Sequence, residues 1–165
     1  MKPSPDVYDI NLRQRLAGAR RIAVVGIGDE NSAVDRLGME AAREIELMHL
    51  PGVRIFFAGT VPESMTGSLR EFHPDHILLL DAADMDSPPG TVAIIDPEKI
   101  PKSHFSTHAL PLSAVMEFIE KDTGAKVTLI GIQPDMRRDE MDSDGQDLLH
   151  RNLAELMGVL RENER

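Results

Sequence analysis

Hydrophobic residues along this chain form short continuous runs that alternate with segments in which they recur every three or four positions. Continuous runs are typical of strands buried on both faces of a parallel sheet, whereas the three-to-four spacing is typical of helices with one buried side. The runs predict strands at residues 21–27, 53–58, 77–81, 91–95 and 126–132. The spacing predicts helices at residues 8–18, at 34–49, through Met65 to Phe72, from Pro111 to Gly124, and through Leu149 to Leu160.

This alternation of strands and helices predicts a three-layer α/β/α sandwich around a mostly parallel, five-stranded sheet. The segment at 91–95 follows a Ser87-Pro-Pro-Gly90 turn, and we expect an edge strand whose tight return makes the sheet mixed. The length of 165 residues suits a single domain with a substantial core. Within that domain of residues 1–165, we expect residues 1–18 to form an N-terminal helical extension outside the main core.

Composition excludes several classes of function. The formal net charge of −10 argues against non-specific binding to nucleic acid or to an anionic membrane, because both require clustered Lys and Arg. A chain without cysteine has no disulfide, zinc–thiolate site or thiol nucleophile. The N-terminus lacks the apolar core of a signal peptide, and no apolar run approaches the roughly 20 residues of a membrane span. We therefore expect a cytoplasmic protein, and the sequence leaves its oligomeric state open.

Polar residues with metal-binding side chains stand at the ends of the predicted strands or in the connections after them. Asp81 follows the apolar run His76-Ile-Leu-Leu-Leu, Asp35 follows the strand at 21–27, and His108 precedes the helix at Pro111. Open α/β sheets build their sites at the carboxyl ends of their strands. Two carboxylates and an imidazole suit a borderline divalent metal. We therefore expect Asp35, Asp81 and His108 to converge on one cleft.

Each of these residues has a simpler explanation when it is taken alone. Asp35 could be a helix cap or a first-turn acid, Asp81 could be stabilised by backbone hydrogen bonds in a turn, and His108 could be solvated. The segment Gly26-Ile-Gly-Asp-Glu-Asn31 suggests a dinucleotide-binding turn, but Asn31 stands where the third glycine is required. The alternative is that these glycines only let the chain turn sharply. The common motifs of hydrolytic enzymes are absent from the sequence.

Ordered sequence blocks extend through most of the chain and together resemble one family. The chain is similar to the hydrogenase maturation endopeptidases, which process the large subunit of [NiFe] hydrogenases, and especially to the branch that serves hydrogenase-3-type and archaeal enzymes. The resemblance is carried by the glycine turn after the first strand with its downstream acid, and by Gly59-Thr-Val-Pro-Glu63, Leu78-Leu-Leu-Asp81-Ala-Ala-Asp-Met85, Thr107-His108-Ala-Leu-Pro-Leu112 and Gly131-Ile-Gln-Pro-Asp135.

The resemblance implies a function and a set of site residues. Asp35, Asp81 and His108 are expected to contact nickel already inserted into the substrate, and Asp35 and Asp81 to act in catalysis. The reaction is removal of the C-terminal extension of a large-subunit precursor, which is the expected partner, with no intrinsic cofactor; in a crystal another divalent metal could occupy the site. The alternative is a non-cleaving hydrogenase assembly factor of the same fold. The particular hydrogenase is not identified, and a coenzyme-F420-reducing enzyme is one candidate.

The sequence departs from the family pattern beside the first of these residues. The family usually has an acid pair followed by Gly-x-Gly, whereas Val34 replaces the first acid and Arg36 replaces the first glycine. The second glycine is retained as Gly38. We expect a less flexible loop, in which Arg36 either pairs with Asp35 and weakens metal affinity or faces the substrate.

Overall fold

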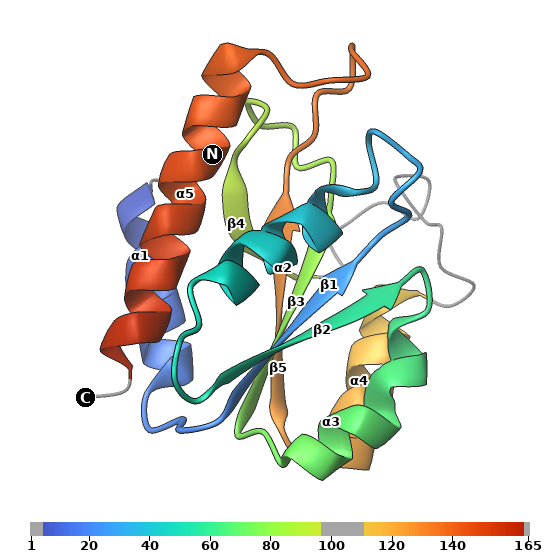
Figure 1. Ribbon diagram of the computed structural model, residues 1–165, viewed down its shortest axis with the longest axis vertical. Helices are drawn as coiled ribbons and strands as arrows, with labels where there is room; N and C mark the ends of the chain where they lie inside the picture. Colours follow the sequence, from blue (N-terminus) through green and yellow to red (C-terminus); the bar gives the residue numbers. More distant parts are fainter. Residues whose placement is uncertain (1–4, 97–110, 164–165) are drawn as a thin grey trace.

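The computed structural model describes residues 5–96 and 111–163, with side chains from residue 11 onward, and is organised around one five-stranded sheet (Figure 1). The strand order is β2-β1-β3-β5-β4. The pairs β1–β2, β1–β3 and β3–β5 are parallel, and the edge strand β4 is antiparallel to β5. The predicted mixed sheet is therefore confirmed. The strands are β1 (Ile22–Ile27), β2 (Val53–Gly59), β3 (His76–Ala82), β4 (Val92–Ile95) and β5 (Lys126–Ile132).

Helices cover both faces of this sheet, which confirms the predicted three-layer sandwich (Figure 1). One face is covered by α1, α2 and α5, and the other by α3 and α4. The helices are α1 (Pro5–Leu16), α2 (Leu37–Leu47), the short 3₁₀ helix η1 (Pro62–Met65), α3 (Thr66–Phe72), α4 (Leu112–Thr123) and α5 (Ser143–Glu162).

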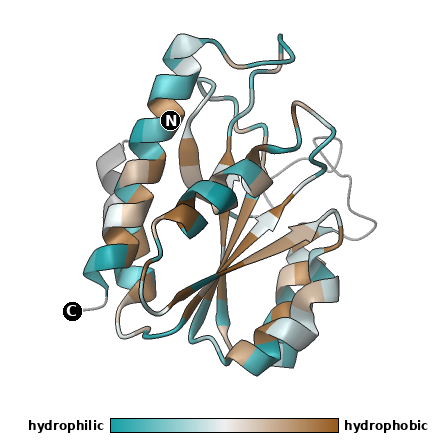
Figure 2. Cartoon of the chain, in the orientation of Figure 1, coloured by the Kyte–Doolittle hydropathy of each residue, from teal (hydrophilic) through white to brown (hydrophobic). Residues whose placement is uncertain are grey.

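Alternation along the central strands divides the core into two layers. Leu78 and Leu80 of β3 pack toward α2 and α5, whereas Ile77 and Leu79 pack toward α3 and α4. Successive side chains of a strand point to opposite faces, so a strand covered on both sides is apolar throughout. Figure 2 shows this pattern, with hydrophobic strands between helices whose outer sides are hydrophilic.

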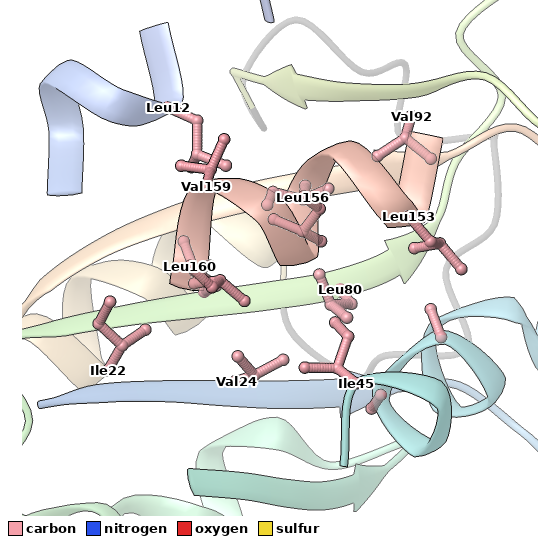
Figure 3. Close-up of a cluster of buried hydrophobic side chains, with 14 of the residues drawn as sticks. Leu12, Ile22, Val24, Ile45, Leu80, Val92, Leu153, Leu156, Val159 and Leu160 are labelled. Carbon is pink, nitrogen blue, oxygen red and sulfur yellow. The ribbon is translucent and has the colours of Figure 1, made fainter. Parts of the chain in front are cut away.

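The N-terminal helix α1 belongs to the core, and the expectation that it would lie outside it was wrong. Leu12 and Leu16 are fully buried, and they share a hydrophobic cluster with Leu156 and Val159 of α5 (Figure 3). The apolar stripe of α1 is narrow, because among its described side chains Leu12 and Leu16 are the only buried ones. That stripe suffices because α5 presents a complementary apolar side to it. Among the described residues, no helix combines the length and apolar character needed to cross a membrane.

A buried histidine lies at the amino-terminal edge of the sheet. His76, at the start of β3, is 3% exposed, and its Nε2 lies 2.8 Å from the Thr128 hydroxyl on β5. Burial, together with the nearby positive charges of Arg15 and Lys126, lowers the pKa of His76 to about 4. The imidazole is therefore neutral in the folded protein at neutral pH.

We expect His76 to make the fold sensitive to acid. In the unfolded chain its pKa is about 6.5, so between about pH 6.5 and pH 4 the unfolded state binds the proton that the folded state excludes. Stability present above pH 6.5 is thus lost as the pH falls, by about 3 kcal/mol over that range. Urea unfolding at pH 7 and pH 4.5 should show a smaller loss for His76→Gln than for wild type. The same loss in both proteins would contradict this assignment, and His150→Gln, at an exposed histidine, is the control.

Candidate active site

The strand order places a topological switch point at the carboxyl ends of β1 and β3. These strands are neighbours, with Gly26 paired to Leu80, yet the chain leaves β1 through α2 toward β2 at one edge. From β3 it continues toward β4 and β5 on the other side of the sheet. In open α/β sheets, ligands bind where the connections of adjacent strands diverge in this way. Asp81 and the segment that carries Asp35 both lie at this position.

Asp81 lies within β3, immediately before its last residue, and its side chain is buried. Its exposed fraction is 3%. Because Leu80 packs toward α2 and α5, alternation directs Asp81 toward the face covered by α3 and α4. Its register partner on β5 is Gly131, which has no side chain on that face. The apolar strand β3 thus places a buried carboxyl group at the edge of the sheet.

Asp35 is also buried, with an exposed fraction of 4%, and lies in the turns between β1 and α2. Its Oδ2 accepts a hydrogen bond from the backbone N–H of Asp29 at 2.9 Å. The helix α2 begins only at Leu37, with Arg36 as its N-cap and without a side-chain capping bond. The prediction of a helix from residue 34 is therefore too long, and Asp35 is not the cap of α2. Its carboxyl group instead organises the loop that follows β1.

Glycines allow this loop and α2 to lie directly on the ends of the strands. Gly28 has a φ of +136°, and a Cβ built on it would lie 1.8 Å from the carbonyl oxygen of Asp35. A Cβ on Gly38 would lie 2.2 Å from the carbonyl oxygen of Leu80 and 2.4 Å from that of Ile27. Residues with side chains could not approach so closely. These contacts hold the segment that carries Asp35 beside the end of β3, where Asp81 lies.

The glycines after β1 therefore serve the packing of the chain. Gly28 and Gly38 are in contact with protein backbone, in agreement with the simpler of the two explanations for the Gly26–Asn31 turn. Gly38 belongs to α2 and not to the loop that precedes this helix.

The third predicted ligand, His108, lies outside the described residues. In the ranges 5–96 and 111–163, no group of three or more His, Cys, Asp or Glu side chains is arranged to hold a metal ion. The structure brings Asp35 and Asp81 to the same edge of the sheet, and the convergence of all three residues stays a prediction. Helix α4, which follows His108 in the sequence, covers the face toward which Asp81 is directed.

A polar groove of about 300 Å³ lies beside the Asp35 loop. It is bordered by the first turns of α2, by the connection after β5 and by the start of α5. Arg36 lines this groove, and its Nε lies 3.0 Å from Glu40 Oε1. This Arg36–Glu40 ion pair is partly exposed, so it contributes little to the stability of the fold. Arg36 can therefore leave Glu40 and interact with a polypeptide bound in the groove. The other charged lining residues are Glu44, Asp135, Arg138, Asp139, Glu140 and His150.

Two residues of the quoted blocks are prominent in the structure although the sequence did not single them out. Among the described residues, Glu63 Oε2 is buried and has no hydrogen-bond partner. Glu63 follows β2, which is parallel to β1, so it lies at the same edge of the sheet as Asp81. Gln133 follows β5 and is buried. The available signal was their place in the segments that follow β2 and β5, but the burial of Glu63 Oε2 and the hydrogen bonds of Gln133 depend on the fold.

Comparison with known proteins identifies the family. The model of the hydrogenase maturation protease family matches residues 19–158. A protein of Methanocaldococcus jannaschii that is provisionally named a hydrogenase maturation protease is 34% identical over 131 residues, covering 74% of this chain and 78% of that protein. The Escherichia coli hydrogenase 3 maturation protease is 38% identical over 79 residues, covering 47% of this chain and 50% of that protein.

Solved structures agree with these sequence matches. A [NiFe] hydrogenase maturation protease from Thermococcus kodakarensis superposes with a TM-score of 0.72 and 30% identity, covering 93% of this chain and 98% of that one. A hydrogenase 3 maturation protease has a TM-score of 0.69 and 27% identity, covering 84% of this chain and 90% of that one. The α/β fold is thus that of a proteolytic enzyme. The chain belongs to the hydrogenase maturation protease family.

Proposed function

We propose that this protease removes the C-terminal extension of a [NiFe] hydrogenase large-subunit precursor after nickel has been inserted. The observation that carries the proposal is the pair of buried carboxyl side chains at one edge of the sheet, Asp81 near the end of β3 and Asp35 in the loop that follows the adjacent strand β1. A carboxyl group is costly to bury without a specific interaction, and such groups gather where a fold binds a ligand. Two of them beside the carboxyl ends of β1 and β3 form a ready set of oxygen ligands.

The nickel is part of the substrate in this proposal, and the protease supplies an incomplete ligand set. Carboxylate oxygens from Asp35 and Asp81, with an imidazole from His108, suit Ni(II) and leave coordination positions for ligands of the substrate. The metal centre of the precursor would be bound only when it is loaded. Cleavage would thereby depend on nickel insertion, without a resident cofactor in the protease.

The carboxyl groups can also take part in amide hydrolysis. One of them, Asp35 or Asp81, can accept a proton from the attacking water, while the substrate's metal polarises the scissile carbonyl. The groove beside Arg36 would hold the polypeptide that flanks the scissile bond, because it opens next to the Asp35 loop and its lining is polar. This is the second of the two roles expected for Arg36.

The proposal is tested by incubating the purified protein with a large-subunit precursor in nickel-loaded and nickel-free form. We expect mass spectrometry to detect a C-terminal fragment only from the loaded precursor, since the ligands of the protease bind the precursor through its nickel. Equal cleavage of both forms would contradict nickel recognition. Binding of the loaded precursor without cleavage would instead support a non-cleaving assembly factor.

A further inference from the structure

A buried amide side chain connects the end of β5 with the turn that follows Asp81. Gln133 is 2% exposed. Its Oε1 accepts a hydrogen bond from the backbone N–H of Met85 at 2.6 Å, and its Nε2 donates to Asp84 Oδ1 at 3.3 Å and to the carbonyl oxygen of Pro134 at 3.1 Å. Both ends of the amide are therefore satisfied, and two of the three bonds reach the turn after β3.

These bonds extend the pairing of β3 and β5 beyond the ends of the strands. Asp81 pairs with Gly131 and Ala82 with Ile132, and the N–H of Ala83 then donates to the carbonyl oxygen of Ile132 at 3.0 Å. At the next position the backbone of Gln133 bonds on the β4 side, where its N–H donates to the Thr91 carbonyl oxygen and its carbonyl oxygen accepts from the Gly90 N–H. On the β3 side its side chain instead accepts from the backbone N–H of Met85 and donates to the Asp84 carboxylate.

The turn that the Gln133 side chain holds packs beside Asp81. A Cβ on Gly131 would lie 3.0 Å from the Met85 sulfur and 3.3 Å from the Ala83 Cβ. Gly131 is the register partner of Asp81, and partners in a parallel pair direct their side chains to the same face. The Met85 side chain thus folds back over the place next to Asp81. Loss of the Gln133 hydrogen bonds would free this turn to move, together with the backbone that follows Asp81.

We propose that Gln133 is a positioning residue, which fixes the turn Ala83–Asp86 and thereby the orientation of the Asp81 carboxyl group. This inference rests on the proposed function, in which Asp81 contacts the substrate's nickel centre. Gln133 does not itself touch substrate. A buried polar network in which every group is hydrogen-bonded is rigid. Loss of some of its bonds therefore changes the positions of the residues that it connects. Displacement of a reacting group by about 1 Å can lower a rate about 100-fold.

The decisive variant is Gln133→Glu, which keeps the shape and the acceptor for Met85 but replaces the donor by an oxygen facing Asp84. We expect kcat for precursor cleavage to fall about 100-fold at pH 8, with a smaller change in KM. The deficit should shrink as the pH is lowered, because a protonated carboxyl group can donate to Asp84 again. Adding Asp84→Asn should restore part of kcat at pH 8, since the amide of the new residue can donate to the new carboxylate, whereas the donor to the Pro134 carbonyl oxygen stays lost.

Asn152→Asp is the matched control. Asn152 is another buried amide, and its Nδ2 donates to the carbonyl oxygen of Gly90 at 3.0 Å; Gly90 in turn bonds to the backbone of Gln133 and not to the turn Ala83–Asp86. We expect this control to lower the Tm but to leave kcat near the wild-type value at every pH. An equal kcat deficit in Asn152→Asp and Gln133→Glu, or no rescue in the double variant, would overturn the positioning role.

Asp81→Asn, assayed in parallel, separates this inference from the proposed function. An inactive Asp81→Asn protein beside a fully active Gln133→Glu protein would overturn the positioning role alone. Wild-type cleavage by both variants would overturn the proposed site and the positioning role together. If Gln133→Glu alone does not fold, the double variant with Asp84→Asn carries the test, and a kcat deficit at pH 8 well below about 100-fold is the expected result.

Discussion

Asp81→Asn is expected to lower precursor cleavage by roughly 1000-fold or more, and Asp35→Asn to have a similar effect. Asparagine keeps the size of each side chain, but it removes a carboxylate ligand for nickel and a group that can accept a proton from water. Both residues are buried beside the carboxyl ends of β1 and β3, so water cannot easily replace the missing group. The measurement is the rate of appearance of the C-terminal fragment from a nickel-loaded precursor.

The matched control is Asp75→Asn at the opposite edge of the sheet. Asp75 Oδ2 accepts hydrogen bonds from the backbone N–H groups of Arg20 and Arg21, each at 2.8 Å, and these bonds lower the pKa of Asp75. The same chemical change there should affect the pH dependence of stability and leave cleavage near the wild-type rate. Activity close to wild type in either Asp35→Asn or Asp81→Asn would contradict the assignment of that residue.

The sheet could be predicted from sequence because its strands are apolar on both faces. Runs such as Ile77–Leu80 have no polar position that would allow an exposed face, so they belong in the middle layer of a sandwich. The antiparallel edge strand was predicted from a tight turn. The position of α1 was not, because the partner that buries Leu12 lies on α5, at the far end of the sequence. A short apolar stripe does not reveal which distant surface it meets.

The candidate site was predicted only in part, for a related reason. Asp81 stands out locally, because an apolar strand runs directly into a carboxyl group. The environment of Asp35 depends on contacts that sequence spacing does not contain, among them the backbone of Gly28 and the N–H of Asp29. The role of Gln133 likewise depends on the register between β3 and β5. Residues that function through non-local contacts become visible only when the fold is known.

Gly38→Ala is expected to destabilise the protein by about 2–4 kcal/mol, although alanine is the better helix former by about 1 kcal/mol. Gly38 lies in α2, and its added Cβ would meet the carbonyl oxygens of Leu80 and Ile27 at 2.2 and 2.4 Å. Backbone oxygens at the ends of two central strands cannot move aside cheaply. The helix must therefore shift outward, and it would carry the Asp35 loop away from Asp81.

The same substitution at Gly158 is expected to have the opposite effect on the free energy of unfolding, so it is the matched control. Gly158 lies within α5, and a Cβ there would meet no atom within 4 Å. Gly158→Ala should stabilise the fold by about 0.5–1 kcal/mol, because only the helix propensity changes. Urea unfolding measures both variants, and precursor cleavage at a temperature where each is folded should fall only in Gly38→Ala. A stabilised, fully active Gly38→Ala protein would show that α2 does not need to rest on the strand ends, and the close approach that joins Asp35 to Asp81 would then lose its structural basis.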